Sequence, residues 1–173
     1  MFENADLQFP NNVVKVIADE LVKLNGDPPD PNGISVFRRP LRQGDPKLSA
    51  GIFASLWLPN EQSYEIGGAT LGGMRQEATL NQYVISIQTL VMDADETRGL
   101  AVSAAFAKTV RDMLLRNPHV GVALSSLSVT DANGLTERVH RRSIRTQRYI
   151  SNEVQGSWTY LASLELTIET ETS

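Results

Sequence analysis

The sequence predicts an α+β fold: a mostly antiparallel β-sheet with two main helices packed on one face and a long C-terminal β-hairpin. Residues 157–170 alternate apolar and polar side chains almost without interruption, which is typical of a half-buried strand. Two amphipathic helix patterns, one early and one in the middle of the chain, are separated by strand patterns. This order favours helices gathered on one face of a sheet. We expect residues 1–173 to form a single domain.

The composition of the chain argues against several classes of protein. The net charge of −4 argues against a protein whose main task is to coat nucleic acid. Cysteine is absent from the sequence, which excludes disulfides, thiolate catalysis and cysteine-bound metals. No run of about 18 apolar residues is present, and the first ten residues lack an export-signal pattern. We therefore expect a cytoplasmically made protein with no membrane segment and no cofactor.

The first helix is expected over residues 13–24, where apolar residues recur every three or four positions. Asn11 and Asn12 precede it and are suited to cap its start. Asn25-Gly26 is a C-terminal helix signal. The proline- and glycine-rich segment 25–33 cannot be regular and is interpreted as a linker within the domain.

Strand patterns occupy the next part of the chain. Residues 34–41 predict a short strand, and residues 48–58 predict a buried strand with residues 63–66 as its partner. Residues 75–92 predict a long strand, clearest from Gln82 onward.

The second helix is expected over residues 93–116. Asp93 and Glu96 have the spacing of a capping box, with the aspartate as the cap. Asn117-Pro118 is expected to end this helix, and residues 120–129 predict the next strand.

The last two strands are expected to form a hairpin over residues 139–170 with a turn near Gln155. Its first strand is rich in arginine, and its second carries glutamate on the polar side. This register sets Arg145 opposite Glu165 and Arg141 opposite Glu169. Cross-strand pairs of opposite charge help to define the register.

Two further arginines, Arg142 and Arg148, fall on the apolar side of the hairpin with Ile144 and Ile150. A closed core would not tolerate these charges without partners. We therefore hypothesise that part of the hairpin extends beyond its own core and contacts another subunit. The interface residues of this hypothesis are Arg141, Arg142, Arg145, Arg148, Glu165 and Glu169. A solvated charged strand and a nucleic-acid-binding surface are the alternatives.

A glycine-rich segment lies between the predicted strands of the first half. It lacks the Gly-Lys-Ser/Thr ending of a phosphate loop and does not lead into a helix. We interpret it as a hairpin tip that contacts a partner. The contact residues of this hypothesis are Gly67, Gly68, Thr70, Leu71, Gly72 and Gly73.

No catalytic motif is present in the sequence. His119 and His140 have no second ligand at metal-binding spacing, so we expect no metal site. Asp93, Asp95 and Glu96 form a group of carboxylates that helix capping explains. A metal-dependent nuclease that uses Asp93, Asp95 and the arginine-rich strand stays open as an alternative.

Three parts of the chain together resemble the tail-terminator, or tail-completion, proteins of long-tailed bacteriophages. They are the leading amphipathic helix at 13–21, the strand that runs into a helix at 82–116, and the ending at 156–166 that follows the arginine-rich strand. The resemblance is one of size, order of the helices and strands, and pattern of apolar and polar residues, and it covers most of the chain.

This resemblance implies a structural protein of the virion tail or neck, made in the host cytoplasm. Such proteins form a ring, usually a homohexamer, on the finished end of the tail tube. The ring binds tail tube protein on one side, stops its polymerisation, and offers the other side to the head-side connector protein. DNA passes through the lumen without specific binding. The hairpin would then make the ring contacts, and the glycine-rich loop would contact an axial partner.

Other classes remain open at this stage. A different neck or head-completion protein and a tail tube protein would share the antiparallel sheet and long loops. A metal-dependent nuclease and a cytoplasmic ligand-binding domain, with a pocket between the sheet and the second helix, are the alternatives of another kind.

Overall fold

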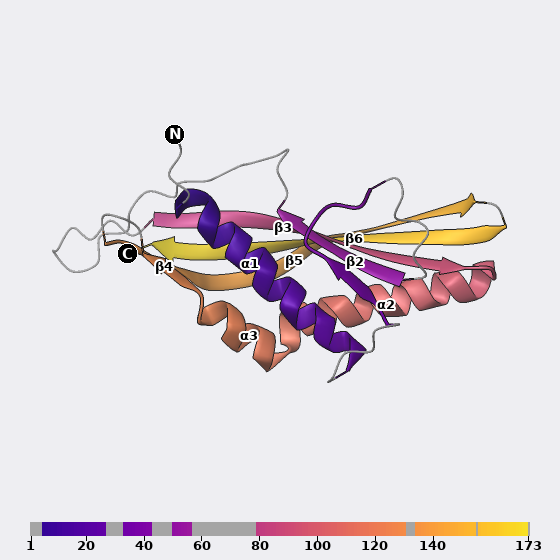
Figure 1. Cartoon of the computed structure of the whole chain (residues 1–173), viewed down its shortest axis with the longest axis horizontal. Helices are drawn as coiled ribbons and strands as arrows, with labels where there is room; N and C mark the ends of the chain where they lie inside the picture. Colours follow the sequence, from indigo (N-terminus) through magenta and orange to yellow (C-terminus); the bar gives the residue numbers. More distant parts are fainter. Residues whose placement is uncertain are drawn as a thin grey trace.

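The computed structural model describes residues 5–26, 33–42, 50–56, 79–130, 134–154 and 156–172. Within these residues, three α-helices cover one face of a strongly twisted sheet (Figure 1). The sheet has six strands in the order β1-β2-β3-β6-β5-β4. The helices are α1 (Ala5–Val22), α2 (Glu96–Arg116) and α3 (Pro118–Ser125), with a 3-10 turn, η1 (Lys23–Asn25). The strands are β1 (Ser35–Phe37), β2 (Ala50–Leu56), β3 (Thr79–Asp93), β4 (Ser128–Thr130), β5 (Thr136–Val154) and β6 (Ser157–Thr172). The α+β prediction is confirmed.

The final strand lies in the middle of the sheet. β6 is antiparallel to β3 from Thr79 opposite Thr172 to Asp93 opposite Trp158, and its other edge pairs with β5. Every even-numbered residue from Tyr160 to Thr170 is buried under the helices, as the alternation predicts. β6 is therefore paired along both edges within its own chain, and its great length serves the sheet itself.

Helix α1 begins eight residues before the predicted start, at Ala5, and continues through Pro10. The sequence interpretation failed because proline and two asparagines resemble a helix boundary. A proline inside a helix removes one backbone hydrogen bond. Phe9 is fully buried, however, and its ring lies 6.0 Å from that of Tyr83. Burial of this large ring favours the longer helix.

The end of α1 is tied to the start of β1. The Asn25 side chain donates to the Ile34 carbonyl at 2.7 Å and accepts from the Ile34 backbone N–H at 2.6 Å. Residues 27–32 of the predicted linker lie outside the described residues. β1 then pairs in parallel with β2, and all other strand pairs are antiparallel.

Residues 118–125 form helix α3, where the sequence had predicted a strand from Val120; the strand β4 itself is short, Ser128–Thr130. Asn117 does end α2, as predicted, but its side chain also caps α3 by accepting from the His119 backbone N–H at 2.8 Å. Pro118 is tolerated at the first helical position because no backbone donor is needed there. Val120 and Leu124, four residues apart, are both fully buried.

The core lies between the helices and the sheet. Its large members come from all three helices and from β2, β3 and β6: Phe9, Ile17, Leu21, Leu114, Leu124, Ile52, Ile85, Ile87, Leu164 and Leu166. The opposite face is partly covered by the chain that follows β1. There Phe37 stacks on Phe53 at 5.0 Å, and the Arg39 guanidinium lies 4.6 Å from the Phe37 ring.

Candidate subunit interface

The outer edge of β5 is the feature of this fold that most needs explanation. β4 pairs only with the first residues of β5, from Ser128 opposite Arg138 to Thr130 opposite Thr136. Beyond them, from Val139 to Val154, no strand among the described residues pairs with this edge (Figure 1). The backbone N–H and C=O groups of an uncovered edge can pair with another chain. The open edge of β5 is therefore the candidate site for subunit contact.

Two β-bulges shape this edge. The register between β5 and β6 shifts between Val139 and Arg141, and again between Ile144 and Gln147. Arg141 stands opposite Glu169, as predicted. At the second bulge two residues of β5, the first of them Arg145, stand opposite the single residue Glu165.

The second bulge also reverses the alternation beyond it. Ile150 stands opposite Leu161, on the face away from the helices. The prediction that Ile150 lies on the apolar side was wrong, because a bulge shifts the alternation by one residue. The side chains of Arg145 and Arg148 lie outside the described residues.

The two described arginines of the edge have different surroundings. Arg141 is exposed, and no ion pair joins it to another residue of the described part of the chain. Arg142 points to the helix side, where its Nη2 donates to the Leu115 carbonyl at 3.1 Å. This carbonyl lies in the last turn of α2, where a positive charge complements the helix dipole. Arg142 thus binds α2 to β5, and Arg141 is presented outward.

Exposed apolar side chains lie near the end of β5, next to the turn into β6. Their exposure was not predicted from the sequence. Ile150 is 60% exposed and Tyr149 is 49% exposed. The sequence placed Ile150 in the apolar row of the hairpin, so no signal marked it as accessible. Large exposed apolar side chains beside an uncovered backbone edge are typical of a surface that another chain covers.

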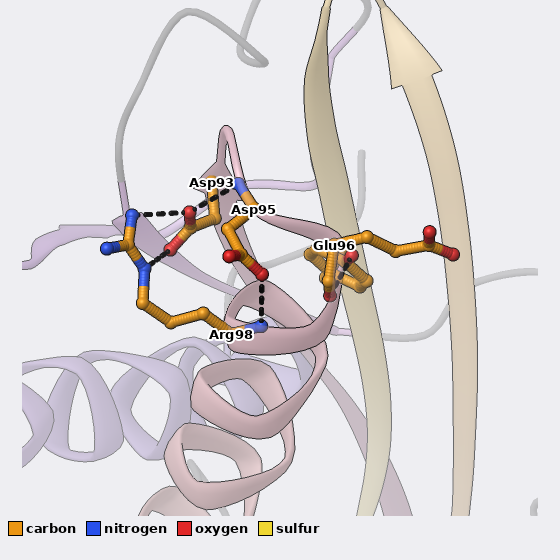
Figure 2. Close-up of polar contacts among 5 residues, drawn as sticks. Asp93, Asp95, Glu96 and Arg98 are labelled. Carbon is orange, nitrogen blue, oxygen red and sulfur yellow. Dashed lines mark hydrogen bonds and ion pairs between the residues drawn. The ribbon is translucent and has the colours of Figure 1, made fainter.

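The carboxylates at the start of α2 are engaged with the helix itself (Figure 2). Asp95, not Asp93, is the N-cap, and its side chain accepts from the Arg98 backbone N–H at 2.8 Å. Asp93 is the last residue of β3 and binds the Arg98 guanidinium through both carboxylate oxygens, at 2.7 and 2.8 Å. The predicted capping box of Asp93 and Glu96 is therefore absent: the strand extends as far as Asp93, the cap falls two residues later, and Arg98 stands three residues after the cap.

These contacts set the ionisation of the group. The bidentate hydrogen bond from Arg98, together with the backbone N–H of Asp95, lowers the pKa of Asp93 to about 2. Burial raises the pKa of Tyr160, whose hydroxyl donates to the Glu96 carbonyl at 2.6 Å. In Figure 2 the Glu96 side chain extends away from Asp93 and Asp95. Within the described ranges, no three His, Asp or Glu side chains are grouped so that they could hold a metal ion.

A polar cluster joins three strands at the other end of the sheet. One carboxylate oxygen of Glu137 in β5 accepts from Asn81 at 3.2 Å, from the Tyr83 hydroxyl at 2.8 Å, and from Thr170. No sequence pattern predicts this cluster, because its members are far apart in the chain. It holds β3, β6 and β5 in register and leaves the glutamate as a structural acceptor.

Other predicted contacts cannot be placed. The glycine-rich segment at Gly67–Gly73 lies outside the described residues, as does the strand expected at 63–66. Glu165 and Glu169 are both half-buried on the face away from the helices.

Among the helices that the structure describes, none is both long and apolar enough to cross a membrane.

No protein-family model matches the sequence, and no curated protein matches it. The solved structures that match the chain include two of low overall similarity. A protein in the virion of a native gene transfer agent particle is 14% identical with a TM-score of 0.37, over 96% of this chain and 99% of that one. A second structure, known only by a sequence identifier, is 14% identical with a TM-score of 0.38, over 91% and 94% of the two chains. We draw no inference on function from similarity at this level.

Proposed function

We propose that the protein is a structural, non-enzymatic component of a phage virion that closes the end of the tail tube as a homo-oligomeric ring. The ring, a hexamer by the family resemblance, would stop tube polymerisation and provide the surface that joins tail to head. The observation that carries this proposal is the open edge of β5 from Val139 to Val154. The resemblance of the helix and strand order to tail-terminator proteins supplies the role.

Ring formation places physical demands on the subunit. A closed ring needs a heterologous interface, in which one surface of a subunit contacts a different surface of the next and rotation closes the circle. The open β5 edge supplies one such surface. Its backbone groups would give affinity, and its arginines and bulges would restrict which partner can pair. An acidic chain lining a channel would also let DNA pass without retention.

Electron microscopy of the purified protein, alone and added to tail tubes of the same virus, tests this proposal. We expect closed single rings, and we expect tubes that receive the protein to stop growing at that end. Tubes of unlimited length formed by the protein alone would assign it to the tube subunits. A protein that stays monomeric and does not bind tube ends would overturn the proposal.

A further inference from the structure

The sheet has a second uncovered edge, at the end opposite to β5. β1 is the last strand on that side, and among the described residues only β2 pairs with it. All three residues of β1 are half-buried, so part of each is accessible to solvent. The described sheet therefore has two different open edges, β1 on one side and the uncovered part of β5 on the other.

The two open edges lie at the same height in the sheet. One row of directly paired residues crosses the sheet from edge to edge through Val36, Ile52, Thr89, Ala162 and Tyr149. The next row crosses it through Ser35, Gly51, Leu90, Leu161 and Ile150. β1 is therefore level with the part of β5 just beyond its second bulge, where the strand is regular again.

Each row also keeps to one face of the sheet, because directly paired residues point the same way. The three inner residues of the first row are fully buried beneath the helices. The outer residues of that row, Val36 and Tyr149, thus share the helix face. Ile150 is on the face away from the helices, and Ser35 shares that face with it.

The strand directions suit a cyclic arrangement. Along the two rows the residue number rises in β1 where it falls in β5, so the two strands run in opposite directions. In a cyclic ring every copy has the same orientation about the axis. A neighbouring copy that continues the sheet would therefore lay its β1 antiparallel to β5, with the two helix faces on the same side.

Helix α2 places an apolar side chain beside this part of the β5 edge. The Tyr160 ring lies against Gly99 in α2, and Tyr160 pairs with Ser151 of β5, so this turn of the helix is one strand from the edge. Leu100 follows and is 54% exposed. It lies about four turns before Leu115, on the same side of the helix, and the Leu115 carbonyl accepts a hydrogen bond from β5. A strand added to the edge would bring its helix-face residues next to Leu100.

We propose that β1 of one subunit pairs antiparallel with residues 148–150 of β5 in the next subunit, so that one sheet continues around the ring. Val36 then lies beside Tyr149 and Leu100 on the helix face, and Ser35 lies beside Ile150 on the other face. This inference rests on the proposed ring and identifies its second surface. Two different edges that meet in this way satisfy the requirement for a heterologous interface.

Disulfide formation between copies tests this register, because the sequence contains no cysteine of its own. The double variants Val36→Cys/Tyr149→Cys and Ser35→Cys/Ile150→Cys are each oxidised with copper phenanthroline. Opposed residues of antiparallel strands have Cα atoms about 4.5–5.5 Å apart, which a disulfide can span. Within one copy, four strand spacings of about 4.8 Å separate β1 from β5, so any disulfide must join two copies.

Exchanged pairs of the same four positions provide matched controls. Ser35→Cys/Tyr149→Cys and Val36→Cys/Ile150→Cys place their two cysteines on opposite faces of the continued sheet. We expect these controls to give at least roughly fivefold less linked product than the same-face pairs. In denaturing gels, the same-face pairs should give a ladder that ends at the size of the ring. Circular dichroism and native mass spectrometry identify the variants that fold and form rings, and the two same-face pairs are independent of each other.

The outcomes separate this contact from the ring itself. Equal linkage in same-face and exchanged pairs, or intact rings without linkage in the same-face pairs, would overturn the inference and leave the proposed ring standing. Linked dimers of the single variant Tyr149→Cys would show that two β5 edges meet and would exclude β1 as the partner. A monomeric wild-type protein would overturn both proposals.

Discussion

The ring of Tyr160 lies directly against the backbone of Gly99. A Cβ atom built at position 99 would lie 2.3 Å from Cε2 of the tyrosine and 2.9 Å from Cβ of Asp93. The Tyr160 hydroxyl donates to the Glu96 carbonyl at 2.6 Å in the same turn of α2. The first turn of α2 is thus held on β6 at a spacing that only glycine permits.

Replacing Gly99 with alanine is expected to lower the free energy of unfolding by about 1–3 kcal/mol, because the helix must move off the tyrosine ring. Gly121→Ala is the matched control. A Cβ there would meet only the end of the flexible Arg142 side chain, at 3.1 Å, so the effect should be smaller. Urea denaturation of both variants measures the difference. Equal effects of the two substitutions would contradict the close contact at Gly99.

The ion pair between Asp93 and Arg98 predicts a specific dependence of stability on pH. The pKa of Asp93 is lowered from 3.8 to about 2, so the folded state favours the charged form. Its contribution is complete above pH 3.8 and is lost as the pH falls toward 2. Asp93→Asn should therefore be less stable than the wild type at neutral pH, and the difference should shrink below pH 4. Thermal unfolding between pH 2 and 7 provides the test, and a constant difference across this range would count against the ion pair.

Arg142 and Arg141 are neighbours with opposite predicted roles. Arg142→Ala removes the donor to the Leu115 carbonyl and the packing of its stem, which should cost about 1–2 kcal/mol of monomer stability. Arg141→Ala should change monomer stability by less than about 0.5 kcal/mol, because this side chain is exposed. Denaturation at low protein concentration separates the two effects. A greater loss of stability in Arg141→Ala would reverse these assignments.

The exposed apolar residues of the β5 edge predict where assembly is sensitive. Ile150→Asp should weaken oligomers by roughly tenfold or more if this edge is covered in the ring. Val122→Asp on α3 is a suitable comparison, because its position is 64% exposed but belongs to a helix and not to the strand with the open edge. Sedimentation velocity of the two variants reports the oligomer directly. Oligomers that lose stability equally in both would place the contact elsewhere.

Elements with a long apolar–polar repeat could be predicted from the sequence, because many residues in succession indicate the same helix or strand. The alternation of β6 corresponds to buried residues such as Leu164. In α2 the later apolar positions, such as Val110, are buried, whereas Leu100 near its start is exposed. The predicted pairing of Arg141 with Glu169 was also correct, but it arises because the bulge between Ile144 and Gln147 shifts by one residue the register that starts from Val154 opposite Ser157. Local signals failed where tertiary contacts outweighed them, as in the passage of α1 through Pro10.

The candidate site was harder to predict, because it is defined by a strand edge that has no partner strand among the described residues. The sequence pointed to the final hairpin as a whole; β6 is paired along both edges, and the open edge belongs to β5. The bulge after Ile144 reverses the alternation along β5, and no pattern in the sequence of this strand marks it.

Native mass measurement of the wild-type protein over a wide range of concentrations tests the central claim most directly. If the uncovered edge of β5 joins one subunit to the next, a single closed oligomer should dominate at micromolar concentration. It should dissociate on dilution, and no larger oligomer should form at any concentration. A monomer that persists at the highest concentration would show that this edge is satisfied without another copy.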